Sequence, residues 1–119
     1  MSRDVITFLE DILTAIDDII AFTASLDFED FKQDRKTVYA VTRALEIMGE
    51  ATKNIPIEVR QAYPKVPWKQ IAGMRDKLIH SYFSVNVVTL WKAVQQDAPQ
   101  LRQIILAVKE DLNRFTPQD

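Results

Sequence analysis

The stretch that decides the fold is residues 87–115, VVTLWKAVQQDAPQLRQIILAVKEDLNRF. Its apolar side chains recur at alternating steps of four and three residues: Val87, Trp91, Val94, Ala98, Leu101, Ile105, Val108, Leu112 and Phe115. This spacing matches the 3.6-residue turn of an α-helix and predicts a long helix with one apolar face. Pro99 cannot donate a backbone hydrogen bond, so we expect it to kink or divide the helix, with Asp97 as the cap of the second part.

The same helical period runs through the first half of the chain. A long amphipathic helix is predicted to begin at an N-cap on Ser2, and its apolar positions are Val5, Leu9, Ile12, Ile16, Ile19 and Thr23. A break is expected at residues 25–30, where Asp27 can cap a second helix with Asp30 three residues later. We expect that second helix to continue until Asn54-Ile55-Pro56 ends it, since proline cannot continue a helix.

The region after Pro56 predicts short helical pieces. Residues 57–63 can form a short helix, residues 63–67 a stiff connector, and Pro67 suits the first turn of a helix over 68–81. Gly73 costs that helix about 1 kcal/mol relative to alanine. A close backbone contact would explain why glycine stands at this position. No segment alternates with period two, so no sheet is expected. The sequence predicts one all-α domain over residues 1–119, an up-down bundle of three long helices with a short helical pair.

Composition excludes several classes of protein. The 119 residues are 47% apolar and 27% charged with a net charge of -2, which is typical of a globular domain and not of a strongly basic nucleic-acid-coating protein. The sequence has no cysteine and one histidine, so a thiolate or multi-histidine metal site cannot form within one chain. Neither a signal peptide nor a membrane span is expected, and a cytoplasmic protein is the default.

Ionisable side chains gather in residues 68–83, WKQIAGMRDKLIHSYF. Asp76 and His80 stand four residues apart and share a helix face, so Asp76 can orient the imidazole. Arg75 lies about 140° around the helix from His80, and Tyr82 falls where the helix should end. From spacing alone, the favoured interpretation is that Arg75 and His80 are a cationic pair near a helix C-terminus and that Tyr82 is a half-buried aromatic.

These residue types suit chemistry on a phosphodiester. A histidine can transfer a proton to or from a ribose oxygen, while an arginine binds the phosphate oxygens and stabilises the charge that develops on them. One histidine does not easily serve as both acid and base. A symmetric homodimer would bring a second Arg75 and a second His80 to the same cleft, so a nuclease reading requires a composite dimer site.

The pattern Arg75-x-x-x-x-His80-x-Tyr82 resembles the R-x-x-x-x-H-x-Y signature of the HepT toxins in the HEPN superfamily. The resemblance extends to residues 43–51 (RALEIMGEA), 66–75 (VPWKQIAGMR), and the segment with Trp91 and Asp97-Ala-Pro99. It implies a HEPN-like bundle and a metal-independent ribonuclease, with Arg75 and His80 catalytic, Asp76 and Tyr82 supporting, and no cofactor. Many family members carry asparagine where this chain has Asp76, a carboxylate that repels an incoming phosphate.

The resemblance also implies a partner and a switch. HepT toxins pair with a minimal nucleotidyltransferase antitoxin, which silences the toxin by adding AMP to the motif tyrosine, here Tyr82. An AMP group there would place a phosphate beside Arg75 in competition with RNA. The alternative is a non-catalytic module that binds a nucleotide or only docks the nucleotidyltransferase. Loss of turnover in His80→Ala with an intact fold would distinguish the two.

Other polar and aromatic residues allow two interpretations. Arg43, Glu46 and Glu50 are either a solvated charged face with an Arg43–Glu46 ion pair or supporting and dimer-contact residues near the cleft. A metal site at the glutamates is rejected because no ligand spacing supports it. Trp68 and Trp91 are expected to be core or interface anchors rather than base-stacking platforms. The lysines that can form a basic rim for RNA, or merely be scattered on the surface, are Lys65, Lys69, Lys77 and Lys92.

Overall fold

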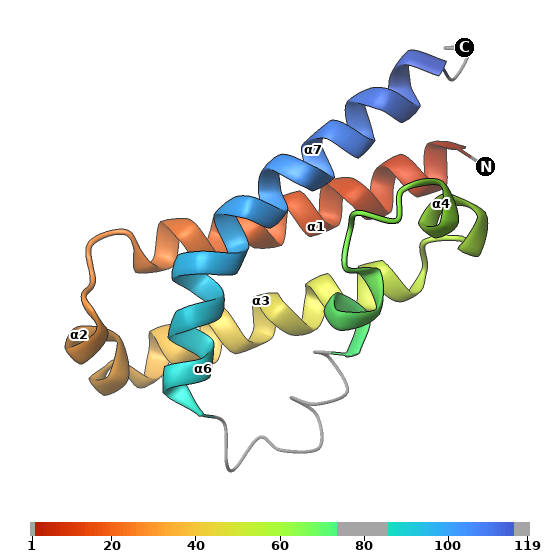
Figure 1. Ribbon diagram of the computed structural model, residues 1–119. Coiled ribbons are helices and arrows are strands. Elements are labelled where there is room, and N and C mark those ends of the chain that lie inside the picture. Colours follow the sequence, from red (N-terminus) through yellow and green to blue (C-terminus); the bar gives the residue numbers. More distant parts are fainter. Residues whose placement is uncertain (1, 74–85, 116–119) are drawn as a thin grey trace.

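The computed structural model describes residues 2–73 and 86–115, and within these ranges every regular element is a helix. Three long helices dominate the molecule (Figure 1), and they are α1 (Ser2–Thr23), α3 (Arg35–Lys53) and α7 (Ala98–Phe115). The shorter elements are α2 (Phe28–Gln33), α4 (Ile57–Ala62), α6 (Val87–Lys92) and a π-helical turn, Ala93–Asp97. Residues 68–73 are also helical. The predicted all-α bundle is therefore confirmed.

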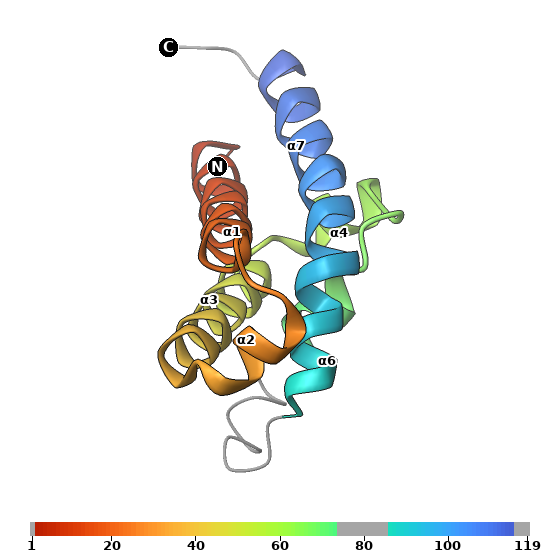
Figure 2. The ribbon, with the colours of Figure 1, turned by 90° about the vertical axis from the view of Figure 1, so that its left-hand side faces the viewer.

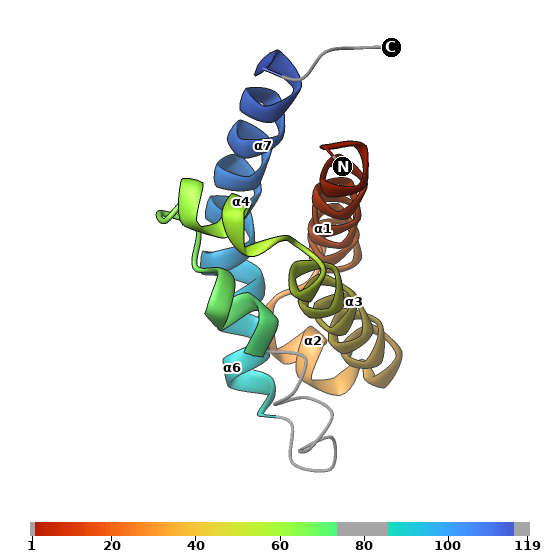
Figure 3. The ribbon, with the colours of Figure 1, turned by 90° about the vertical axis from the view of Figure 1, so that its right-hand side faces the viewer.

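The helices lie in two layers, which Figures 2 and 3 show from opposite sides. Helices α1 and α3 form one layer, whereas α6, the π turn, α7, α4 and residues 68–73 form the other. Helix α1 packs against both α3 and α7. Its side chains with no exposed surface are Leu9, Ile12, Ile16 and Ile19. Burying each of them stabilises the fold by roughly 1.5–3 kcal/mol, so the predicted apolar face of α1 is the centre of the core.

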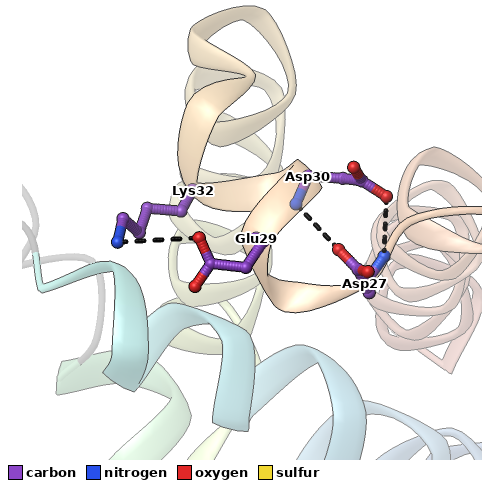
Figure 4. A network of polar contacts seen from close by, with 4 residues as sticks. All are labelled: Asp27, Glu29, Asp30 and Lys32. Atoms are coloured by element: carbon purple, nitrogen blue, oxygen red, sulfur yellow. Dashed lines mark hydrogen bonds and ion pairs between the residues drawn. The ribbon is translucent and has the colours of Figure 1, made fainter.

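The second predicted helix begins where the sequence placed it. The Oδ1 atom of Asp27 accepts a hydrogen bond from the backbone N–H of Asp30 at 2.8 Å, and Oδ2 of Asp30 accepts one from the N–H of Asp27 at 3.3 Å. Figure 4 shows this reciprocal capping box, together with the exposed ion pair between Lys32 and Glu29 (3.8 Å). The capping box satisfies two backbone donors that the first turn of α2 leaves free.

The prediction of one continuous helix up to Pro56 was wrong, because the chain breaks at Asp34 between α2 and α3. Asp34 has φ -96° and ψ 88°, and its carboxylate accepts hydrogen bonds from the Thr37 hydroxyl (2.7 Å) and the Thr37 backbone N–H (3.1 Å). These bonds lower the pKa of Asp34. Phe31 and Val38 stand seven residues apart, which is about two helical turns. The apolar spacing therefore continues across Asp34 and does not reveal the break.

The kink near Pro99 is a π turn and not a capped break. The backbone N–H of Ala98 donates to the carbonyl of Ala93, five residues earlier, and the chain remains helical on both sides. Asp97 therefore lies inside the helical run, and its predicted role as a cap was wrong. In a regular α-helix, the ring of Pro99 would clash with the carbonyl of Gln95, four residues earlier. The wider π turn accommodates the ring.

Candidate functional site

The motif residues Arg75, Asp76, His80 and Tyr82, with Lys77, lie outside the described residues. The structure describes the two elements that border the motif in the chain. These are the helical residues 68–73 before it and α6 after it. Both borders belong to the layer that contains α7.

The upstream border is anchored by Trp68, which is 6% exposed. Its indole Nε1–H donates to the carbonyl of Tyr63 at 3.0 Å, and the backbone N–H of Ile71 donates to the carbonyl of Pro67 at 3.1 Å. The predicted helix start after Pro67 and the predicted anchor role of Trp68 are thus confirmed. The close contact considered for Gly73 is not found in the described part of the chain, where no heavy atom lies within 4 Å of the position of an added Cβ.

Tyr63 also binds α7, which sequence reasoning missed. Its hydroxyl donates a short hydrogen bond to the Asp111 carboxylate. Burial, together with this bond and the negative charge of Asp111, raises the pKa of Tyr63 to about 12. No local sequence signal joins residues 48 positions apart. The contact fixes the connector, and through Trp68 it also fixes the start of the upstream border.

The downstream border is anchored by a cap and an aromatic cluster. The Asn86 side-chain oxygen accepts hydrogen bonds from the backbone N–H groups of Val88 (2.9 Å) and Thr89 (3.3 Å), and so it caps α6. The Trp91 ring packs with its centroid 5.1 Å from that of Phe31 and 6.2 Å from that of Phe28. Trp91 is therefore an anchor between α6 and α2, as the sequence predicted.

Arg43, Glu46 and Glu50 come together on one groove between α1 and α3. The groove has a volume of about 270 Å³, and its lining also includes Phe8 and Ile47. Arg43 Nη1 lies 3.3 Å from Glu46 Oε2, which is the ion pair that the sequence predicted. The Arg43 side chain is 71% exposed, so this pair contributes little to stability.

Charge is unevenly distributed between the two layers. Three lysines that flank the motif in the sequence lie among the described residues, and all three are exposed: Lys65, Lys69 and Lys92. The exposed face of α1 instead carries carboxylates at seven-residue intervals: Asp4, Asp11 and Asp18. An RNA backbone would meet cations on the layer that borders the motif and carboxylates along α1.

Two further observations concern residues 2–73 and 86–115 alone. No group of three or more His, Cys, Asp or Glu side chains in this part could hold a metal ion. None of its helices has the length and apolar character needed to cross a membrane.

Comparison with known proteins identifies the family to which the chain belongs. The profile described as "Ribonuclease HepT-like" matches residues 12–108. The chain is 53% identical over 102 residues to "Probable ribonuclease HepT" of Thermococcus cleftensis, covering 86% of this chain and 93% of that protein. It is 46% identical over 110 residues to "Putative RNase MJ0125" of Methanocaldococcus jannaschii, covering 92% and 95%. No solved structure gives a significant match.

The matched region includes both borders and the whole Arg75–Tyr82 motif between them. The family profile covers more than half of the chain, and both relatives are matched over nearly their full length. The resemblance seen in the sequence is therefore confirmed, and the chain belongs to the HepT-like ribonuclease family of the HEPN superfamily.

Proposed function

We propose that this protein is a metal-independent endoribonuclease of the cytoplasm that acts as a homodimer and as the toxin of a toxin–antitoxin pair. The observation that carries the proposal is the family match over residues 12–108, because it spans Arg75 and His80. The relatives are named as ribonucleases, which gives the substrate class. The anchored borders on either side of the motif support it further.

Each step of the proposed reaction uses a motif side chain. His80 of one protomer accepts the proton of a ribose 2′-hydroxyl, and the 2′-oxygen attacks the adjacent phosphorus. The bond from phosphorus to the 5′-oxygen breaks, and His80 of the partner subunit protonates the departing oxygen. The products are a 2′,3′-cyclic phosphate and a 5′-hydroxyl. Arg75 binds the non-bridging oxygens, and Asp76 orients His80 or Arg75.

The charge distribution supports RNA as the substrate. Lys65, Lys69 and Lys92 are exposed on the layer that borders the motif, where they can contact phosphates on either side of the scissile bond. The net charge of -2 means that this local rim, and not the whole surface, would attract RNA. We therefore expect salt-sensitive binding of modest affinity.

Regulation is proposed to act on Tyr82. A minimal nucleotidyltransferase would transfer AMP from ATP to the Tyr82 oxygen and release pyrophosphate. The added phosphate would lie beside Arg75 and block RNA by charge and by bulk. Arg43, Glu46 and Glu50 are proposed as supporting or dimer-contact residues.

An RNA cleavage assay in excess chelator tests the proposal. Unmodified protein should cleave RNA and leave cyclic phosphate ends, read by mass spectrometry, whereas His80→Ala and Arg75→Ala should lose nearly all turnover. Arg114→Ala, an exposed arginine near the end of α7, is the matched control and should cleave normally. Absence of cleavage by folded, dimeric wild type would overturn the enzyme and leave a nucleotide-binding or docking module.

A further inference from the structure

A hollow lies between α4 and the upstream border of the motif. Its volume is about 570 Å³, which is within the range of sites that hold small ligands. Figure 3 shows α4 and residues 68–73 in the same layer of the molecule. We call this feature the α4 hollow, and its lining includes Ile57, Arg60, Pro67, Trp68, Lys69 and Gln70.

The charged side chains that line the α4 hollow, among the described residues, are cations without a carboxylate. Lys69 is exposed and Arg60 is half-buried, whereas Glu58 of α4 is not part of the lining. Two other concave sites differ in this respect. The groove between α1 and α3 is lined by three carboxylates, and the hollow beside α7 is lined by Glu110 and Asp111. The α4 hollow therefore favours an anionic occupant.

Arg60 is held in place at the α4 hollow by the end of α3. Its Nη2 donates to the carbonyl of Thr52 at 2.8 Å, and its Nε donates to the carbonyl of Ile55 at 3.1 Å. Both acceptors are uncharged, so these bonds do not neutralise the guanidinium. Because the side chain is already ordered, it loses little conformational entropy when an anion binds beside it.

The remainder of the α4 hollow is suited to a nucleobase. Ile57 is 59% exposed, and together with Pro67 and the edge of the buried Trp68 it provides an apolar wall. Gln70 is exposed, and its side-chain amide offers both a hydrogen-bond donor and an acceptor. Apolar surface for a base, an amide for its edge and cations for its phosphate are the groups that bind single-stranded RNA.

The α4 hollow also precedes the motif closely in the chain. Gln70 comes five residues before Arg75, and five residues span at most about 18 Å when fully extended. An RNA strand of a few nucleotides covers such a distance. A strand whose phosphate is bound by Arg75 can therefore continue into the α4 hollow.

We propose that the α4 hollow is a subsite for a nucleotide on one side of the scissile bond, with Lys69 and Arg60 at its phosphate and Gln70 at its base. This inference rests on the ribonuclease in the proposed function and assigns part of the path of the RNA. The exposed lysines by themselves provide only charge, whereas the α4 hollow adds a place for a base.

Substitutions of Ile57 test the charge of the α4 hollow, because this side chain is exposed and its replacement leaves the core intact. Fluorescence anisotropy measures the dissociation constant of a labelled 2′-O-methyl oligonucleotide, which lacks the 2′-hydroxyl that the proposed cleavage requires. Ile57→Glu should raise this constant at least about fivefold, and Ile57→Lys should lower it at least about twofold. The matched controls are Phe22→Glu and Phe22→Lys at an exposed position on α1, and each should change it less than about twofold.

Lys69→Ala tests the phosphate contact. The slope of the logarithm of the binding constant against the logarithm of salt concentration should decrease in magnitude by about 0.7, as expected for one lost contact with a single strand. With cleavable RNA, KM should rise at least about threefold while kcat stays the same, because the contact is made equally in the ground state and the transition state. Lys36→Ala, at an exposed lysine of α3, is the matched control and should change neither quantity.

Gln70→Leu tests the contact with the base. It should change the ratio of the dissociation constants for 2′-O-methyl oligoadenylate and oligouridylate at least about threefold, since each base presents different hydrogen-bonding groups. An unchanged ratio would overturn the base contact.

The combined results separate this subsite from the proposed function. Cleavage by wild type, with binding that ignores the Ile57 and Lys69 substitutions, would overturn the subsite and leave the ribonuclease standing. Binding that responds to them in a wild type that does not cleave would overturn the enzyme and keep the α4 hollow as an RNA site. A wild type that neither binds nor cleaves RNA would overturn both.

Discussion

Tyr63 and Asp111 join the connector before the motif to the last helix through a hydrogen bond from the phenol to the carboxylate. The carbonyl of Tyr63 also accepts the indole hydrogen bond of Trp68. Tyr63 thus links α7 to the upstream border of the motif, although neither Tyr63 nor Asp111 is part of the motif itself.

Tyr63→Phe should lower the free energy of unfolding by about 1 kcal/mol, because it removes one partly buried hydrogen bond and leaves the ring packed. Urea unfolding followed by circular dichroism measures the change. Tyr39→Phe is the matched control, since its hydroxyl accepts an exposed hydrogen bond from Arg35 (3.3 Å). Equal effects of the two variants would show that the Asp111 contact contributes nothing.

The raised pKa of Tyr63 predicts that the fold loses stability at high pH. Its pKa is raised from 10.0 in the unfolded chain to about 12 in the fold, so folding favours the protonated phenol. The resulting stabilisation is complete below pH 10 and is lost as the pH rises from 10 towards 12. Wild type should therefore lose more stability than Tyr63→Phe over that interval. Parallel pH profiles for the two proteins would contradict the prediction.

Arg60 caps the end of α3 from a neighbouring helix. Its Nη2 donates to the carbonyl of Thr52 at 2.8 Å, and its Nε donates to the carbonyl of Ile55 at 3.1 Å. Arg60→Ala should destabilise the fold by about 1.5–3 kcal/mol, because two hydrogen bonds from a charged guanidinium to carbonyls at the end of α3 are lost. The thermal midpoint should fall clearly, whereas Arg114→Ala should leave it nearly unchanged. A fall of the same size in both variants would refute a specific cap.

Asp34 should stabilise the start of α3 only while it is ionised. Its pKa is lowered by the hydrogen bonds from Thr37, so its contribution is present above the unfolded-state value and disappears as the pH falls below it. Asp34→Ala should lower the urea midpoint at pH 7 and have a smaller effect at pH 2. An effect that is as large at pH 2 as at pH 7 would argue against the ionised cap.

Phe31 and Phe28 offer a matched test of the aromatic cluster at the downstream border. Phe31 has no exposed surface, whereas Phe28 is only half-buried, and both rings pack on Trp91. Phe31→Ala should cost about 3–5 kcal/mol of unfolding free energy and Phe28→Ala much less. Tryptophan fluorescence during urea unfolding reports both. If the Phe28 variant proved the less stable, the assigned core would be wrong.

Local sequence signals predicted the helix boundaries well. Asp27 with Asp30, Pro56 and Pro67 each set a helix end that the structure confirms, because caps and prolines act on their immediate neighbours. The break at Asp34 also had a local signal, an aspartate three residues before Thr37, but the continuous apolar period masked it.

Contacts between distant residues could not be predicted in this way. Nothing in the sequence near Tyr63 points to Asp111, and nothing near Arg60 points to the Thr52 carbonyl, since both contacts depend on how the helices pack. The motif was recognised from residue types and spacing. Its assembly from two protomers remains a prediction, because the sequence period of one chain carries no information about the position of a second.

The π turn at Ala93–Asp97 is geometrically equivalent to one residue inserted into an α-helix. Each residue of an α-helix rotates the chain by about 100°, so deleting one residue here would rotate α6 relative to α7 by that angle. Leu90 and Trp91 would leave their places against the core, and Asn86 would meet the motif from a different direction. A change of a single codon in length, outside the Arg75–Tyr82 motif, would thus reorient one border of the site while leaving every motif residue intact.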